Sequence, residues 1–160
     1  IRSVYLACLL VLFMFTAPSL AADSLPLKGV KGLKTVFAYG NGSPERASVV
    51  FSAIRDTYRS ESVTALPEAP ATVIVFHSKA INLITTGRKG APEEEKRSEK
   101  IAEMIRQFKK DGVKMEVCMY AVKAMGVDPE TIMPEINKVG NGFVSIAGYQ
   151  SQGFSVIFLP

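Results

Sequence analysis

The stretch that decides the fold runs from Val113 to Val127 and reads VKMEVCMYAVKAMGV. An apolar alternation leads into Cys118, and a helix-like segment follows at once, so the pattern predicts a strand that passes directly into a helix. A cysteine at such a junction is either a small core residue or a reactive thiol. This stretch alone leaves both interpretations open.

The same strand-to-helix pattern recurs along the rest of the chain. Ser43 is a good N-cap for a helix that follows an apolar run, and Pro44 suits the first helical position. The expected strands cover residues 33–40, 72–76, 113–117, 136–140 and 154–160. The expected helical segments cover residues 43–60, 80–85, 93–110, 118–125, 128–134 and 143–153. This alternation predicts one layered α/β domain with a mainly parallel sheet.

Right-handed crossovers would bring the strand-to-helix turns to one edge of this sheet, where ligands bind in such folds. Cys118 is the first catalytic candidate, because backbone N–H groups at a helix start favour a nucleophilic thiolate. His77 is the second, because it is the only histidine of the chain. The residues expected to line the same pocket are Asn41, Gly42, Ser43, Ser78, Met119, Tyr120, Lys123, Asn141 and Gly142. The alternatives are that Cys118 is a core residue and that His77 only forms a hydrogen bond within its own turn.

The first residues have the layout of a secretory signal. Arg2 precedes an apolar run, and small residues follow Pro18. The run is shorter than the roughly 20 apolar residues of a membrane span, so we expect cleavage and no stable membrane anchor afterwards. A retained membrane anchor is the alternative interpretation. We therefore expect a signal peptide over residues 1–22, a leader over 23–33, an α/β domain over 34–160 and a periplasmic location.

Cysteine content and charge narrow the classes of function. Once the expected signal is removed, Cys118 is the only thiol, so no internal disulfide can form and redox chemistry is invited. The signal carries one of the 19 basic residues, which leaves 18 against 15 acidic ones. With no basic stripe interleaved by aromatic residues, nucleic acid is not an expected partner.

No cofactor is expected from the motifs of the chain. A metal site would have to use Cys118, His77 and Met119, which are soft or borderline ligands that would suit copper, but nothing fixes their spacing. No acid–histidine–serine set with a recognisable signature is present either. The prediction is therefore no metal and no cofactor.

Several features of the chain belong together: the strand that ends at Cys118, the helix up to Gly126, the pair Asn141 and Gly142, and the closing segment GYQSQGFSVIFLP. Together they resemble the DsrE/DsrF-like sulfur-relay proteins over residues 34–160. The resemblance implies a flavodoxin-like three-layer sandwich with a five-stranded sheet in the order 2-1-3-4-5. It also implies homo-oligomers, trimers or hexamers, and a cysteine matching Cys118 that carries persulfide sulfur between a donor and an acceptor protein.

Two features depart from the family pattern. Cytoplasmic members often carry an Arg-Arg-Gly sequence where this chain has residues 123–126, Lys-Ala-Met-Gly, which argues against tRNA-thiolation partners. The expected export signal is the second departure. The sequence thus predicts an exported, sulfurtransferase-like sulfur carrier that acts through Cys118. The alternative is a non-catalytic oligomeric module that binds a small ligand or a metal.

Overall fold

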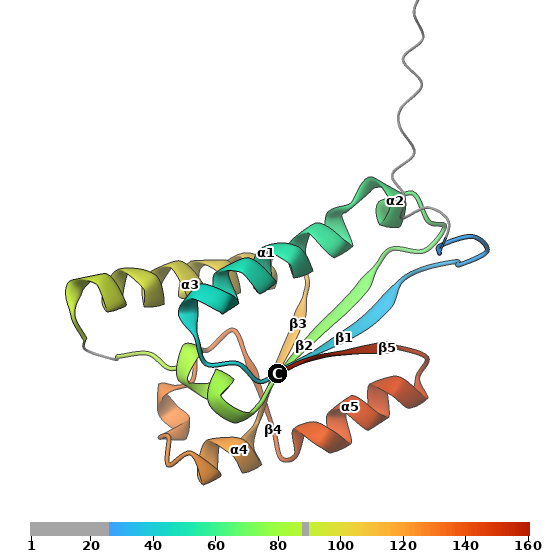
Figure 1. The fold of residues 1–160 in the computed structure, drawn as a ribbon. Coiled ribbons are helices and arrows are strands. Elements are labelled where there is room, and N and C mark those ends of the chain that lie inside the picture. The colour runs from blue at the N-terminus through green and yellow to red at the C-terminus, as the bar shows by residue number, and fades with distance from the viewer. Residues whose placement is uncertain (1–25, 88–89) are drawn as a thin grey trace, which may run out of the picture.

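The computed structural model describes residues 26–87 and 90–160 (Figure 1). The expected signal peptide lies outside these residues. Five parallel strands form one sheet: β1 (Lys34–Tyr39), β2 (Ala71–Phe76), β3 (Lys114–Cys118), β4 (Asn137–Val139) and β5 (Ser155–Leu159). The helices are α1 (Pro44–Arg59), α2 (Glu61–Thr64), α3 (Pro92–Lys110), α4 (Met119–Ala124) and α5 (Gly142–Ser151), with 3-10 turns η2 (Ser78–Leu83) and η3 (Pro129–Thr131). The predicted α/β class and parallel sheet are confirmed.

The strand order is β4-β3-β2-β1-β5, so the expected order 2-1-3-4-5 is wrong. The chain steps in one direction from β1 to β4 and then returns to place β5 beside β1. Right-handed crossovers in opposite directions put their helices on opposite faces of a sheet. Accordingly α1 and α3 cover one face while α5 covers the other (Figure 1).

Two apolar clusters hold these layers together. On the α1 and α3 face, Phe37 and Tyr39 of β1 belong to the large cluster, whereas Val36 belongs to a small cluster that packs against Ile146 of α5 and its neighbours. Successive side chains of a strand point to opposite faces, so one unbroken apolar strand supplies both clusters. This explains why the central strands show no polar alternation.

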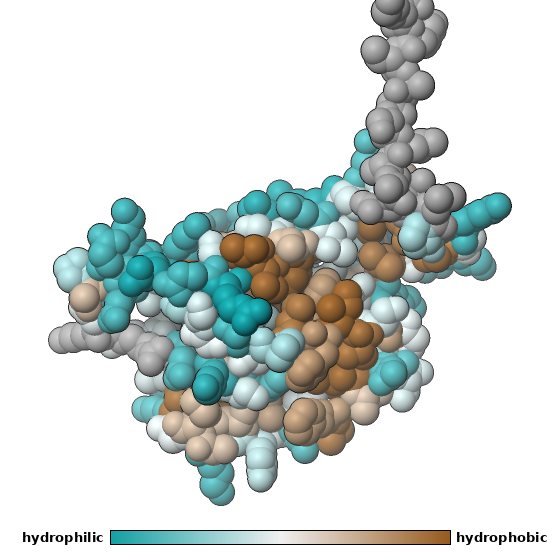
Figure 2. All heavy atoms as spheres, in the orientation of Figure 1, coloured by the Kyte–Doolittle hydropathy of each residue, from teal (hydrophilic) through white to brown (hydrophobic). Residues whose placement is uncertain are grey.

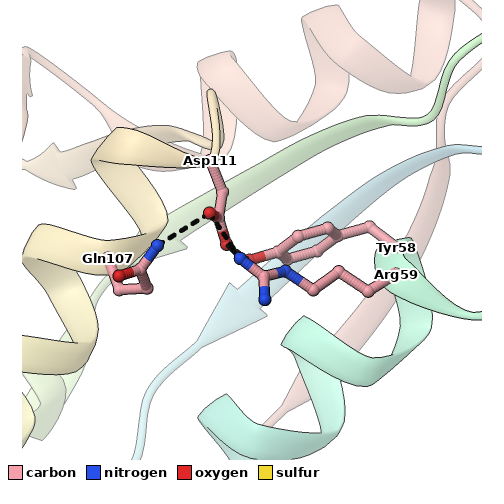
Figure 3. Close-up of polar contacts among 4 residues, drawn as sticks. All are labelled: Tyr58, Arg59, Gln107 and Asp111. Carbon is pink, nitrogen blue, oxygen red and sulfur yellow. Dashed lines mark hydrogen bonds and ion pairs between the residues drawn. The ribbon is translucent and has the colours of Figure 1, made fainter.

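A polar cluster fastens the last turn of α1 to the end of α3 (Figure 3). The carboxylate of Asp111 accepts hydrogen bonds from Tyr58 Oη, Arg59 Nη2 at 2.7 Å and Gln107 Nε2 at 2.8 Å. Burial alone would raise the pKa of Asp111, but these donors outweigh it and lower the pKa. Both helices start at the carboxyl edge of the sheet, so their C-terminal ends, and this cluster, lie at the opposite edge. The cluster therefore stabilises the packing of the two helices away from the edge where ligands bind.

The local predictions fail in two places. The short helix α2 was not expected, and the segment predicted as helical at residues 80–85 is the 3-10 turn η2, which begins directly after His77. Among the described helices, none combines the length and the apolar character that a bilayer crossing requires.

Candidate functional site

The carboxyl edge of the sheet brings Cys118 and His77 to one face. Cys118 is the last residue of β3, and His77 directly follows β2. Phe76 pairs with Val117 across these parallel strands, and His77 and Cys118 are the next residue of each strand. The two candidates therefore lie opposite each other. The side chains at these positions point toward α5, the face opposite α1.

A cavity of about 240 Å³ opens at this point between α4 and α5. Its walls come from the strand ends and from one side of each helix. The lining residues are His77, Ser78, Cys118, Tyr120, Ala121, Ala124, Met125, Gly142, Phe143 and Ile146. Five of the predicted site residues, including both catalytic candidates, therefore share one cavity.

Cys118 lies against the start of α5. Its side chain is buried, at 5% exposure. A Cβ added to Gly142 would stand 2.9 Å from the Cβ and 3.5 Å from the Sγ of Cys118, which is too close for an unstrained contact with the former. Glycine at this position thus allows α5 to begin directly on the cysteine, so the cysteine forms part of the cavity wall beneath the helix start.

His77 is held with one ring nitrogen engaged and the other free. Its Nδ1 lies 2.9 Å from Ser78 Oγ, and its buried Nε2 has no hydrogen-bond partner among the described residues. The ring stacks on Phe158 at 5.5 Å between centroids. It also lies so close to Gly40 that a Cβ there would stand 2.7 Å from His77 Cε1. Packing therefore fixes the ring while leaving one nitrogen unsatisfied.

Ser78 adopts an unusual backbone conformation to reach this position. Its φ is 50°, in the left-handed region that costs a non-glycine residue about 1–2 kcal/mol. In this conformation Ser78 starts the turn η2 and places its hydroxyl on the imidazole of His77. Such a local cost at a cavity wall is a feature of functional sites.

The protonation state of His77 follows from its burial. Burial disfavours the charged ring and lowers the pKa of His77, and the nearby backbone of Ala38 opposes this shift without cancelling it. His77 is consequently neutral at neutral pH. Either nitrogen can carry the one proton of a neutral ring, and in the tautomer that donates from Nδ1 to Ser78, Nε2 is an acceptor.

The depressed pKa of His77 predicts a stability change at mildly acidic pH. The unfolded chain takes up a proton near pH 6.5, while the folded chain does so only at lower pH. The contribution of His77 to the free energy of unfolding should therefore be at its maximum above pH 6.5 and should fall as the pH drops below this value. Urea unfolding between pH 7.5 and 5.5 measures this slope. Since the chain has one histidine, His77→Gln should flatten it, and an unchanged slope in that variant would refute the assignment.

Three predicted pocket residues lie elsewhere. Asn41, Gly42 and Ser43 follow β1, but the chain there turns toward α1 on the other face. Ser43 Oγ accepts from Arg46 N and caps α1, while Asn41 Nδ2 donates to the carbonyl of Pro160 at 3.3 Å. Gly42 lines a separate cavity beside α3. The prediction that this turn lines the cysteine pocket is wrong.

Three further predictions fail for reasons of helix geometry. Met119 packs against the large core cluster, and Lys123 is exposed on α4 outside the cavity lining. Asn141 caps α5 by accepting from Phe143 N at 2.9 Å. With Met119 outside the cavity, the hypothetical copper set is not assembled. Residues 26–87 and 90–160 also contain no group of three His, Cys, Asp or Glu side chains arranged to hold a metal.

Sequence reasoning missed the apolar wall of the cavity. Its members are Ala121, Ala124, Met125, Phe143 and Ile146. Their spacing of three and four residues marks one side of a helix. A buried core face gives the same spacing, so the pattern alone could not identify a cavity wall.

Glu116 is a second residue that the sequence analysis missed. It lies two positions before Cys118 on the same face and is 4% exposed. Its carboxylate accepts from Ser145 Oγ and from Tyr149 Oη at 2.6 Å, and it pairs with Lys114 Nζ at 3.2 Å. Burial alone would raise the pKa of Glu116, but these partners lower it overall. Glu116 thus anchors α5, and with it the cavity wall, to β3.

Comparison with known proteins agrees with the fold. The model of the DsrE/DsrF-like family matches residues 35–159. The fold is similar to that of the protein of unknown function MTH1491 from Methanobacterium thermoautotrophicum, with a TM-score of 0.63 and 17% identity over 79% of this chain and 98% of that one. It is also similar to the ychN protein from E. coli, with a TM-score of 0.53 and 15% identity over 79% of this chain and 100% of that one.

A search among curated proteins gave no match. At the identities found, the two solved structures support the fold alone. The family match spans every strand of the sheet, from β1 to β5, and includes both Cys118 and His77. On that match, the chain belongs to the DsrE/DsrF-like family.

Proposed function

We propose that Cys118 receives a sulfur atom as a persulfide and passes it to an acceptor thiol. One observation carries the proposal: Cys118 and His77 line the same cavity, and the buried Nε2 of His77 has no hydrogen-bond partner among the described residues. A thiol and a neutral imidazole that line one cavity supply the nucleophile and the base that a transfer reaction needs. Membership of the DsrE/DsrF-like family, whose resemblance implies a sulfur-relay role, adds support.

The reaction balances without a cofactor. His77 Nε2 takes the proton of the Cys118 thiol, and the thiolate attacks the outer sulfur of a donor persulfide R–S–SH. The donor S–S bond breaks, a new S–S bond forms on Cys118, and the leaving thiolate takes the proton from His77 to give R–SH. Transfer to an acceptor is a second thiol–persulfide exchange, in which the acceptor thiolate attacks the outer sulfur. No net oxidation or reduction occurs in either step.

Intact mass spectrometry tests this proposal. After incubation with a small-molecule persulfide and removal of the excess, the protein should gain the mass of one sulfur atom. The Cys118→Ser variant should gain none, because Cys118 is the only free cysteine among the described residues. Reduction with a phosphine should remove the added mass from the loaded protein. Full loading of Cys118→Ser would contradict the proposal.

Two further parts of the proposal concern location and partners. The layout of residues 1–22 supports export to the periplasm, which cell fractionation checks directly. A sulfur carrier also needs a donor and an acceptor. We propose a protein as the acceptor and, as the donor, a persulfide carried by a protein or by a small molecule.

An exposed apolar surface supports the proposal of a homo-oligomer, a trimer or hexamer. Val144 of α5 is 69% exposed, and Ile157 and Phe158 of β5 are 42% and 61% exposed. Figure 2 shows hydrophobic residues gathered where Figure 1 places β5. Because β5 is an edge strand, it also presents unpaired backbone groups beside these side chains. Such an edge is suited to a second copy of the chain.

Sedimentation analysis tests this surface. The unaltered protein should sediment as an oligomer, and Ile157→Lys should shift it toward the monomer because the interface would then bury a charge. The control is Val49→Lys, which alters an equally apolar and exposed side chain on α1 and should leave the mass unchanged. A monomeric wild-type protein would contradict this part of the proposal.

A further inference from the structure

We propose that the cavity between α4 and α5 selects uncharged, apolar organic persulfides as the sulfur donors of Cys118. This inference rests on the proposed function and goes further, because it names the chemical class of the donor. It follows from the size of the cavity, the character of its walls and the position of its few polar atoms.

The cavity is large enough for an organic group attached to sulfur. Its volume is about 240 Å³. An engineered protein cavity of about 150 Å³ is sufficient to hold benzene. A benzyl group or a branched alkyl chain therefore fits beside Cys118, with the donor sulfur at the thiol.

The walls of the cavity are hydrocarbon. On α4 they are formed by Ala121, Ala124 and Met125, and on α5 by Phe143 and Ile146. Across the described ranges, the lining includes no Lys, Arg, Asp or Glu side chain. An anionic or zwitterionic donor would lose water here without gaining an ion pair, whereas an apolar donor gains from burial.

The polar atoms lie together at the strand ends. Cys118 supplies the sulfur, and His77 supplies a ring nitrogen without a partner on a side chain that is only 8% exposed. Ser78 Oγ is engaged by His77 Nδ1. The sulfur of a donor can therefore reach Cys118 at the strand ends while its organic group remains in the apolar part.

The mouth of the cavity is aromatic. Tyr120 is 73% exposed and Phe143 is 70% exposed, and both contribute to the lining. Exposed aromatic side chains at the entrance of an apolar cavity offer contact area to an apolar ligand as it enters. The entrance and the interior thus favour the same class of donor.

The reaction with such a donor is the exchange described for Cys118. The thiolate attacks the outer sulfur of R–S–SH, the S–S bond of the donor breaks, and R–SH leaves with the proton held by His77. Only the group R distinguishes one donor from another. Selectivity therefore arises from the binding of R in the cavity.

A matched pair of donors tests the inference. Isobutyl persulfide and carboxymethyl persulfide have nearly the same shape, and they differ in whether the end of R is apolar or a carboxylate close to sulfur. Loading of Cys118 is followed by intact mass spectrometry, and each rate is divided by that of the same donor with free glutathione. Isobutyl persulfide should load at least about tenfold faster, because each buried methylene-sized group is worth roughly fourfold.

A cavity-filling variant adds a second measurement. Ala124 lines the cavity but is an exposed residue, so Ala124→Phe can place a ring in the cavity without disturbing the core. This variant should slow loading by benzyl persulfide about tenfold or more. Ala147→Phe is the control, because Ala147 is exposed on α5 outside the lining and the same substitution should leave the rate unchanged.

The outcomes separate this inference from the proposed function. Equal normalised rates for the matched pair, or an Ala124→Phe variant that loads like Ala147→Phe, would overturn the donor selectivity while leaving Cys118 a sulfur carrier. Failure of all three donors to load Cys118 would overturn the proposed function itself.

Discussion

His77→Gln is expected to slow the loading of Cys118 by about 100-fold at pH 7, the lower end of what a positioned general base contributes. In the proposed reaction the neutral imidazole accepts the thiol proton, and its ring is held between Phe158 and Gly40. Glutamine keeps a polar side chain of similar reach but has no basic nitrogen. Stopped loading reactions analysed by intact mass spectrometry give the rate.

The pH dependence distinguishes a missing base from a damaged fold. At high pH, hydroxide in the solvent can generate the thiolate without His77. The defect of His77→Gln should therefore shrink by pH 9.5, whereas a misfolded site would stay slow. Loading at pH 7 within about twofold of the unaltered protein would show that His77 is not the base.

Phe51→Ala is expected to lower the free energy of unfolding by about 3–5 kcal/mol. Phe51 is fully buried in α1 and makes edge-to-face contacts with Tyr39 at 5.2 Å, Phe108 at 5.5 Å and Phe76 at 6.1 Å. Its removal leaves a cavity under the strand ends that lead to Gly40 and His77. Because whole domains are stable by only about 5–15 kcal/mol, the loss is a large share of the total.

Urea unfolding at pH 7 measures this effect, and the midpoint should fall while the slope stays constant. Val49→Ala is the control, since Val49 lies in the same helix at 71% exposure and its truncation should cost less than about 0.5 kcal/mol. Equal losses in both variants would show that the aromatic cluster does not hold the layers together.

Local patterns predicted the elements of this fold but not their order. The β-branched run that becomes β2 and the capped start of α1 depend on near neighbours in the chain, so their positions could be read from the sequence. The position of β5 beside β1 depends on the face over which α5 crosses the sheet. That choice is made by contacts such as Glu116 with Tyr149, 33 residues apart, which no local period records.

The candidate site was predictable to the same extent. Cys118 and His77 were identified because each ends a strand, and parallel strands end at one edge. Asn41 ends a strand as well, yet its turn leads to the opposite face, which depends on the helix that follows rather than on the turn itself. Gly142 was expected at the edge, but its packing on Cys118 crosses 24 residues and follows only from the placement of α5.

Cys118 is proposed to carry a sulfur atom that can be passed on. The most direct test of this proposal is a single-turnover transfer: the loaded protein, freed of donor, is mixed with a small acceptor thiol and followed by intact mass and peptide mapping. We expect the added sulfur to map to the peptide that contains Cys118 and to leave as one atom, while an equal amount of persulfide appears on the acceptor. Sulfur that maps to another residue, or that stays on Cys118 when the acceptor is in excess, would contradict it.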